Sequence, residues 1–251
     1  MALSDLGGGL RGAVGFLTRL PVSTTGEDWD RFRTFPAAFP IVGYLIGAIA
    51  AVPFVLAAPA ASTAFGYLLV LVGLVGIPHL DGIADLGDAV AAHGKDTRRR
   101  ALKDTTTGVG AIVAVAVVVA GLVLAALGLA GLPTLVAVGI VVAAEVGAKL
   151  GMAAVACLGT ASHEGLGSAF TRGTEPALLV GPLLVSLPAA LFVGALPATV
   201  VTVAVGPLVA VALVRWADRT LGGVNGDIFG AVNELGRLFG LHVGVIAWTL
   251  S

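Results

Sequence analysis

The chain has 251 residues, of which 57% are apolar and 12% are charged, and its mean hydropathy is +1.02. This composition excludes an ordinary water-soluble protein, because 14 basic and 15 acidic side chains are too few to cover a hydrated surface. The formal net charge of −1 provides no basic excess for a nucleic acid partner, so we expect a lipid bilayer to surround most of the chain.

Apolar segments long enough to cross a membrane follow one another along the chain. A helix rising about 1.5 Å per residue needs roughly 20 residues to cross about 30 Å of hydrocarbon. The runs lack the period-two alternation of strands. They predict an all-α, polytopic helical bundle of about six or seven transmembrane helices, formed as one membrane-embedded domain over residues 1–251. The predicted spans are 36–58, 61–78, 108–129, 133–156, 176–194 and 197–214, with a shorter apolar segment at 238–250.

Charged residues are confined to alternate connections between these spans. The turns at 59–63, 128–133 and 195–198 contain no charge, so parity places thirteen of the 14 basic residues on one face. The positive-inside rule predicts that this face is cytoplasmic and that the protein is a multi-pass protein of the cell membrane. The acidic residues follow the same pattern. The exceptions, Glu145 and Lys149, are one turn apart inside a span, where we expect them to pair or to contact a polar cavity.

The segment from His79 to Gly94 carries three aspartates directly after the second predicted span. With about 100° of rotation per residue, spacings of four and seven place Asp81, Asp85 and Asp88 on one helix face. Like charges so close repel unless a hard cation neutralises them, and Mg²⁺ prefers a few carboxylates together with water and phosphate oxygens. A solvated acidic helix start is the alternative. Three carboxylates on one face favour metal binding.

Three further polar segments fall on the same predicted face. Lys103 and Asp104 precede Gly108 and resemble an edge for phosphate and metal, although basic runs also act as topology signals. Asp227 and Glu234 are seven residues apart among glycines, which fits either a ligand site or an interfacial helix. Glu164 lies in the third segment, close to Arg172.

Six segments in order give the chain a family resemblance. Together they resemble the cobalamin synthase family, the adenosylcobinamide-GDP ribazoletransferases, and they cover roughly a quarter of the chain. Each segment alone is a weak signal, but their order is specific. The segments are FLTRLPV (Phe16 to Val22), FPIVGYLIG (Phe39 to Gly47), HLDGIADLGDA (His79 to Ala89), KDTTTGVG (Lys103 to Gly110), EGLG (Glu164 to Gly167) and NGDIFGAVNELG (Asn225 to Gly236).

The resemblance implies Mg²⁺-dependent attack by a hydroxyl of alpha-ribazole, or of its 5′-phosphate, on adenosylcobinamide-GDP, with release of GMP. It implies catalytic roles for Asp81, Asp85 and Asp88. The same three aspartates, with Asp104 and Asp227, are the predicted metal ligands. The predicted substrate contacts are Lys103, Asp104, Glu164, Asn225, Asp227 and Glu234.

Departures from the family pattern affect the predicted phosphate contacts. Thr106 stands where the family often has Arg, Asn225 stands where it commonly has Thr, and Lys149 lies near a common family Arg. Arg and Lys present different donor geometry. The sequence names no general base and is compatible with a homo-oligomer.

Two other functions compete with this interpretation. A CDP-alcohol phosphotransferase of phospholipid synthesis also carries an aspartate-rich Asp-Gly stretch, but its pattern places Ala-Arg soon after, whereas here Ala84 precedes Asp85. A cation-dependent transporter should place ionisable groups near the bilayer midplane, and only Glu145 and Lys149 meet that expectation.

Overall fold

The structure is a computed structural model that describes residues 3–56, 58–94, 97–98 and 106–251. In these ranges all the named elements are helical, and the β pairing is an isolated bridge between Ala161 and Val224. The predicted all-α class is confirmed. The elements are α1 (Leu3–Leu17), α2 (Gly26–Phe32), α3 (Ala38–Ala50), α4 (Val52–Val55), α5 (Ala60–Val75), α6 (Pro78–Ala91), α8 (Val109–Ala130), α9 (Thr134–Leu158), α10 (Leu166–Thr171), η1 (Pro176–Leu179), α11 (Val180–Ala190), η2 (Val193–Ala195), α12 (Ala198–Thr220) and α13 (Gly226–Thr249).

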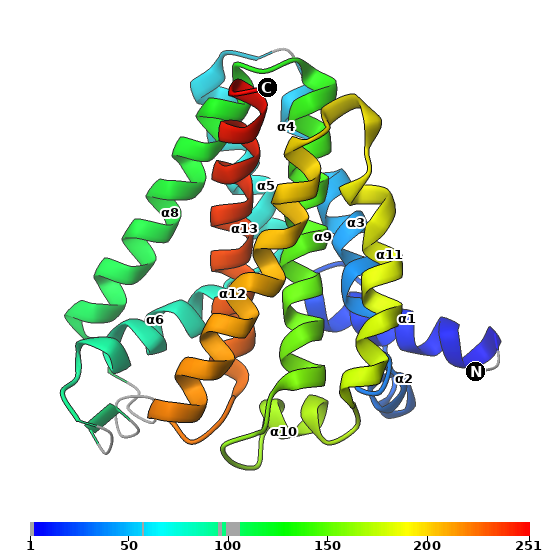
Figure 1. Cartoon of the computed structure of the whole chain (residues 1–251), viewed down its shortest axis with the longest axis vertical. Coiled ribbons are helices and arrows are strands. Elements are labelled where there is room, and N and C mark those ends of the chain that lie inside the picture. The colour runs from blue at the N-terminus through cyan, green and yellow to red at the C-terminus, as the bar shows by residue number, and fades with distance from the viewer. Residues whose placement is uncertain (1–2, 57, 95–96, 99–105) are drawn as a thin grey trace.

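Four helical segments are long and apolar enough to cross a membrane, namely Ala38–Val55, Val109–Ala130, Thr134–Leu158 and Ala198–Thr220. The bent pair α5 and α6 gives a fifth if it is taken as one span. Helices α11 and α13 lie in the same bundle beside these spans (Figure 1). They do not meet the same criterion, because η1 and α11 together are short and α13 carries Asn233, Glu234 and Arg237.

Helix α9 is the centre of the bundle. Its most apolar window is 83% buried, whereas that of α8 is 28% buried, so α8 lies at the lipid-facing edge. Helices α3, α12 and α13 all pack against α9. Glycines permit the closest crossing: a Cβ added at Gly206 of α12 would lie 1.8 Å from the carbonyl oxygen of Gly147 in α9. Small residues therefore let the core helices pack closely.

The two ends of the bundle differ in chemistry. Figure 1 shows α6, α10 and the turn between α12 and α13 at one end, and α4, the α8–α9 turn and the C-terminus at the other. The connections at the second end carry no charged residue. We call the first the charged end, and it gathers the polar segments as the parity of the spans predicts.

Helices α5 and α6 meet at 96°, so α6 runs across the charged end instead of continuing the line of α5. The break has a local cause. Gly76 ends α5 with a φ of 76°, and Pro78 opens α6, where its missing N–H costs no helical hydrogen bond. The predicted span over 61–78 is therefore too long at its end, and the aspartate segment forms a separate helix as expected.

Helix α13 corrects the prediction of a short apolar segment at 238–250. It begins at Gly226 and runs unbroken to Thr249, so Glu234 and Arg237 lie inside the bundle and not on its charged face. Arg237 is only 1% exposed. The helix continues through these polar residues because ion pairs within the bundle compensate their charges, as described below.

Candidate active site

The three aspartates of α6 share one helix face at the charged end. Asp81 is exposed, and Asp85 and Asp88 are partly buried. On the opposite side of the helix, Ile83 and Leu86 are buried and anchor α6 to the bundle. The predicted arrangement of the carboxylates is confirmed.

The start of α13 brings a fourth carboxylate to this face. Asn225 caps the helix: its side-chain oxygen accepts from the Ile228 N–H at 3.2 Å, and its amide donates to the Asp227 carboxylate at 2.6 Å. A Cβ at Gly82 would lie 2.7 Å from the carbonyl oxygen of Asp227, so only glycine lets α6 approach so closely. This contact explains why a glycine lies between Asp81 and Asp85.

The four carboxylates act on one another electrostatically. Burial, followed by the charges of Asp227, Asp81 and Asp88, raises the pKa of Asp85 to about 6. Among the described residues, no Lys or Arg forms an ion pair with any member of this cluster. Its negative charge is therefore uncompensated by the described protein, and its oxygen donors are those that a hard cation prefers.

Within the described part of the chain, no three acidic, His or Cys side chains are already gathered as a metal site. The donor chemistry of the cluster fits Mg²⁺, which binds through one or two carboxylates and completes its shell with water and phosphate oxygens. The cluster therefore offers part of the ligand shell that such a cation needs.

Asp88 has a structural task that distinguishes it from Asp81 and Asp85. Its carboxylate accepts from the backbone N–H groups of Gly108 at 2.8 Å and Ala111 at 2.9 Å. It thereby caps the N-terminus of α8, where unpaired N–H groups and the helix dipole favour an anion. Asp88 joins α6 to α8, and each of its oxygens already has one partner.

We expect Asp88→Ala to destabilise the protein by about 1 kcal/mol, the usual cost of losing a helix cap, which corresponds to about 2–4 °C in Tm for a chain of this size. Thermal unfolding in detergent measures the change. Asp81→Ala is the matched control, because Asp81 is exposed at the other end of the same face. Equal Tm values for the two variants would contradict the capping role.

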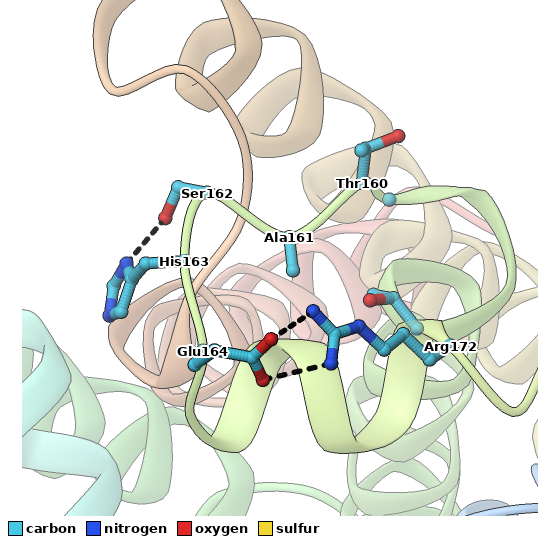
Figure 2. Close-up of a pocket in the computed structure, with 8 residues that line it drawn as sticks. Thr160, Ala161, Ser162, His163, Glu164 and Arg172 are labelled. Carbon is cyan, nitrogen blue, oxygen red and sulfur yellow. Dashed lines mark hydrogen bonds and ion pairs between the residues drawn. The ribbon is translucent and has the colours of Figure 1, made fainter.

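Glu164 lies in a pocket of about 540 Å³ at the charged end, lined by the loop from Gly159 to Glu164 together with Thr171 and Arg172. Figure 2 shows its carboxylate facing the guanidinium of Arg172, and one of the two hydrogen bonds between them is 2.8 Å long. The loop is tied to the start of α13, because Val224 donates to Thr160 and accepts from Ser162. Glu164 therefore belongs to the same end of the molecule as the carboxylate cluster.

Lys103 and Asp104 lie outside the described residues. The glycines that follow them are described: Gly108 contacts Asp88, and Gly110 packs against Gly87 of α6. The start of α8 therefore adjoins the aspartate helix.

Glu234 lies about two helical turns from Asp227 and is buried in an ion-pair network. Both of its carboxylate oxygens accept from Arg237 at 2.7 Å, and Arg237 also donates to Glu145, with one bond of 3.0 Å. Lys149 is 3.9 Å from Glu145, so the expected pair exists but is the longer contact. The two negative charges of Glu145 and Glu234 are therefore offset by the two positive charges of Lys149 and Arg237 within the bundle.

Asn233 connects this network to the aspartate helix. Its carbonyl oxygen accepts from Lys149, and its amide donates to Glu234 at 2.9 Å and contacts the His79 ring nitrogen Nδ1 at 3.1 Å. Sequence reasoning missed Asn233 and Arg237. The available signal was the spacing of Glu234 and Arg237, three residues apart on one helix face, next to the glycines that allow close packing.

The fold and the site define an integral membrane protein whose helical bundle carries an uncompensated carboxylate cluster at its charged end. The chain belongs to the family described as cobalamin-5-phosphate synthase, whose pattern matches residues 9–245.

Relatives extend over most of the chain. An adenosylcobinamide-GDP ribazoletransferase of Halorubrum lacusprofundi is 48% identical and covers 96% of this chain and 97% of its own. A protein of the same name from Haloquadratum walsbyi is 43% identical, and the match covers 96% of this chain and 98% of the relative. A third protein of that name, from Escherichia coli O157:H7, is 34% identical, and the match covers 90% of this chain and 94% of the relative. No solved structure matches the chain.

Proposed function

We propose that this chain is an adenosylcobinamide-GDP ribazoletransferase of cobalamin biosynthesis. It joins adenosylcobinamide-GDP to alpha-ribazole, or to alpha-ribazole 5′-phosphate, and releases GMP. Family membership and the names of relatives that cover nearly the whole chain support this activity. The substrates are soluble, and the carboxylate cluster lies at the charged end, where water has access to the exposed Asp81.

The single observation that carries the mechanism is the cluster of Asp81, Asp85 and Asp227 without a described cationic partner. We propose that these carboxylates hold Mg²⁺, with Asp104 as a further ligand and Asp88 contributing the oxygen lone pairs that its helix cap leaves free. When bound, Mg²⁺ neutralises charge on a diphosphate and on its leaving group.

In the proposed reaction, a ribose hydroxyl that alpha-ribazole and its 5′-phosphate have in common, and therefore not the 5′-hydroxyl, supplies the oxygen that forms a bond to the phosphorus carrying cobinamide. The bond from that phosphorus to the GMP oxygen breaks. The hydroxyl proton passes to a carboxylate of the cluster or to water. Asn225 orients Asp227 through its 2.6 Å hydrogen bond, and Lys103 and Glu164 remain proposed substrate contacts. Glu234 is not proposed as one, because Arg237 holds both of its oxygens inside the bundle.

We also propose that the charged end faces the cytoplasm and that the protein lies in the cell membrane. Arg215 and Arg219 are exposed at the end of α12, and Arg172 is exposed beside Glu164. Cationic residues at one end of a bundle are typical of its cytoplasmic side.

Purified protein in detergent is expected to form the cobamide phosphodiester from alpha-ribazole and adenosylcobinamide-GDP when Mg²⁺ is present. Excess EDTA should abolish turnover, and an excess of Mg²⁺ should restore it, because the carboxylates alone cannot offset the diphosphate charge. Product and GMP are measured by chromatography with mass detection, and CDP-diacylglycerol with a lipid-headgroup alcohol serves as the control substrate pair. Turnover of the control pair alone would overturn the assignment.

A further inference from the structure

A second pocket, separate from that in Figure 2, lies beside Asp227. Its volume is about 230 Å³, and its walls include Phe16 from α1, His79 from α6, Phe170 from α10 and Phe229 from α13. Asp227 also lines it. The pocket therefore adjoins the carboxylate cluster, although its other walls are mainly apolar and include three phenylalanines.

The aromatic walls are fixed by packing. The Phe170 ring lies between the other two, with its centroid 5.8 Å from that of Phe16 and 5.4 Å from that of Phe229. Phe170 and Phe229 are 1% and 2% exposed, so the bundle restricts their rotation. Phe16 is 39% exposed, so its ring is the one open to a ligand, and the two buried rings hold the wall behind it in place. A rigid aromatic wall suits a flat aromatic ligand.

The hydrogen bonds of His79 determine what this side chain offers the pocket. Lys149 has only donors, so the Asn233 atom that meets it is the carbonyl oxygen, and the Asn233 amide must face His79. That amide donates to Nδ1 of His79, which is therefore unprotonated. A neutral ring then carries its proton on Nε2, and within the described residues Nε2 has no hydrogen-bond partner.

We propose that this pocket binds the base of the acceptor nucleoside, a planar bicyclic aromatic ring with a ring nitrogen that accepts a hydrogen bond from Nε2 of His79. The inference rests on the proposed function and locates one of its substrates. The base lies among Phe16, Phe170 and Phe229, and the attached ribose extends toward Asp227. Gly226 and Gly230 also line the pocket, where the absence of a side chain lets Leu166 and the backbone of His79 approach α13 closely.

Direct binding tests the inference without the second substrate or Mg²⁺. The probes are alpha-ribazole and the indole riboside of the same shape, in which a C–H group replaces the accepting nitrogen. Calorimetric titration of protein in detergent is expected to show about tenfold tighter binding of alpha-ribazole, the effect of one hydrogen bond. Equal affinities would overturn the role of His79.

Two variants separate the parts of the pocket. His79→Leu should remove the preference for alpha-ribazole while leaving the affinity for the indole riboside within about twofold. Leu166→Trp, which fills the pocket from α10, should weaken both nucleosides by at least about tenfold. Leu178→Trp, at a partly exposed position in η1, is the matched control and should change neither affinity.

Unchanged binding to Leu166→Trp would overturn the pocket assignment, and circular dichroism with gel filtration confirms that each variant is folded. Failure of the transferase assay with normal nucleoside binding would instead contradict the proposed function alone.

Discussion

Asp85→Asn is expected to lower turnover by about a thousandfold or more, with little change in the stability of the protein. Asp85 lies between Asp81 and Asp88 on the α6 face, and burial, followed by the charges of the other three carboxylates, raises its pKa to about 6. Asparagine keeps the shape but removes the anionic ligand. Loss of metal stabilisation worth several kcal/mol corresponds to this fold-change, at 1.36 kcal/mol per factor of ten.

Asp218→Asn is the matched control, because Asp218 is an exposed carboxylate near the same end, on α12, and lies outside the cluster. Initial rates with both substrates at saturation and Mg²⁺ varied over a wide range measure the effect. Asp85→Asn should also require more Mg²⁺ for half-maximal rate. Near-normal turnover at low Mg²⁺ would exclude Asp85 from the proposed metal site.

Local periodicity explains what could be predicted about this site. The shared face of Asp81, Asp85 and Asp88 depends only on helical rotation, and the gathering of polar segments at one end depends only on counting spans. The helix that carries the aspartates is confirmed, and the described polar segments lie at one end except for Glu234 and Arg237, which are buried inside the bundle. Neither prediction requires knowledge of which helix packs against which.

The remaining features depend on contacts between distant segments. Asp88 caps α8 by accepting from Gly108 and Ala111, which follow it by 20 and 23 positions in the chain. Helical periodicity does not indicate contacts at such separations. The buried position of Arg237 depends on Glu145, 92 positions earlier. An arginine beside an apolar segment is typical of a membrane boundary, which is why Arg237 suggests that a span begins after it. Predicting α13 as one helix requires knowing that Glu145 compensates the charge of Arg237 inside the bundle.

The break between α5 and α6 lies between these cases. Gly76 and Pro78 are visible in the sequence and together disfavour a continuous helix. Their effect on direction is not local, since the 96° turn is held by contacts such as that of Gly82 with Asp227. That turn places the aspartates across the end of the bundle and beside α13.

Arg237→Leu is expected to destabilise the protein by about 3–5 kcal/mol, or about 10 °C in Tm. The guanidinium is 1% exposed and serves both Glu145 and Glu234, so its removal leaves two buried carboxylates opposite Lys149 alone. Leucine replaces the packing volume in part but offers no donor. Thermal unfolding in detergent, with Arg215→Leu at an exposed site of α12 as the control, measures the loss.

The double variant Glu145→Leu with Arg237→Leu distinguishes charge imbalance from lost packing. It leaves Glu234 and Lys149, whose charges balance, and Asn233 still contacts both of them. If uncompensated charge causes the defect of Arg237→Leu, the double variant should be more stable than that single variant, because removing both partners avoids leaving a buried charge unpaired. Additive destabilisation in this double-mutant cycle would show instead that the helices depend on the volume and shape of the arginine.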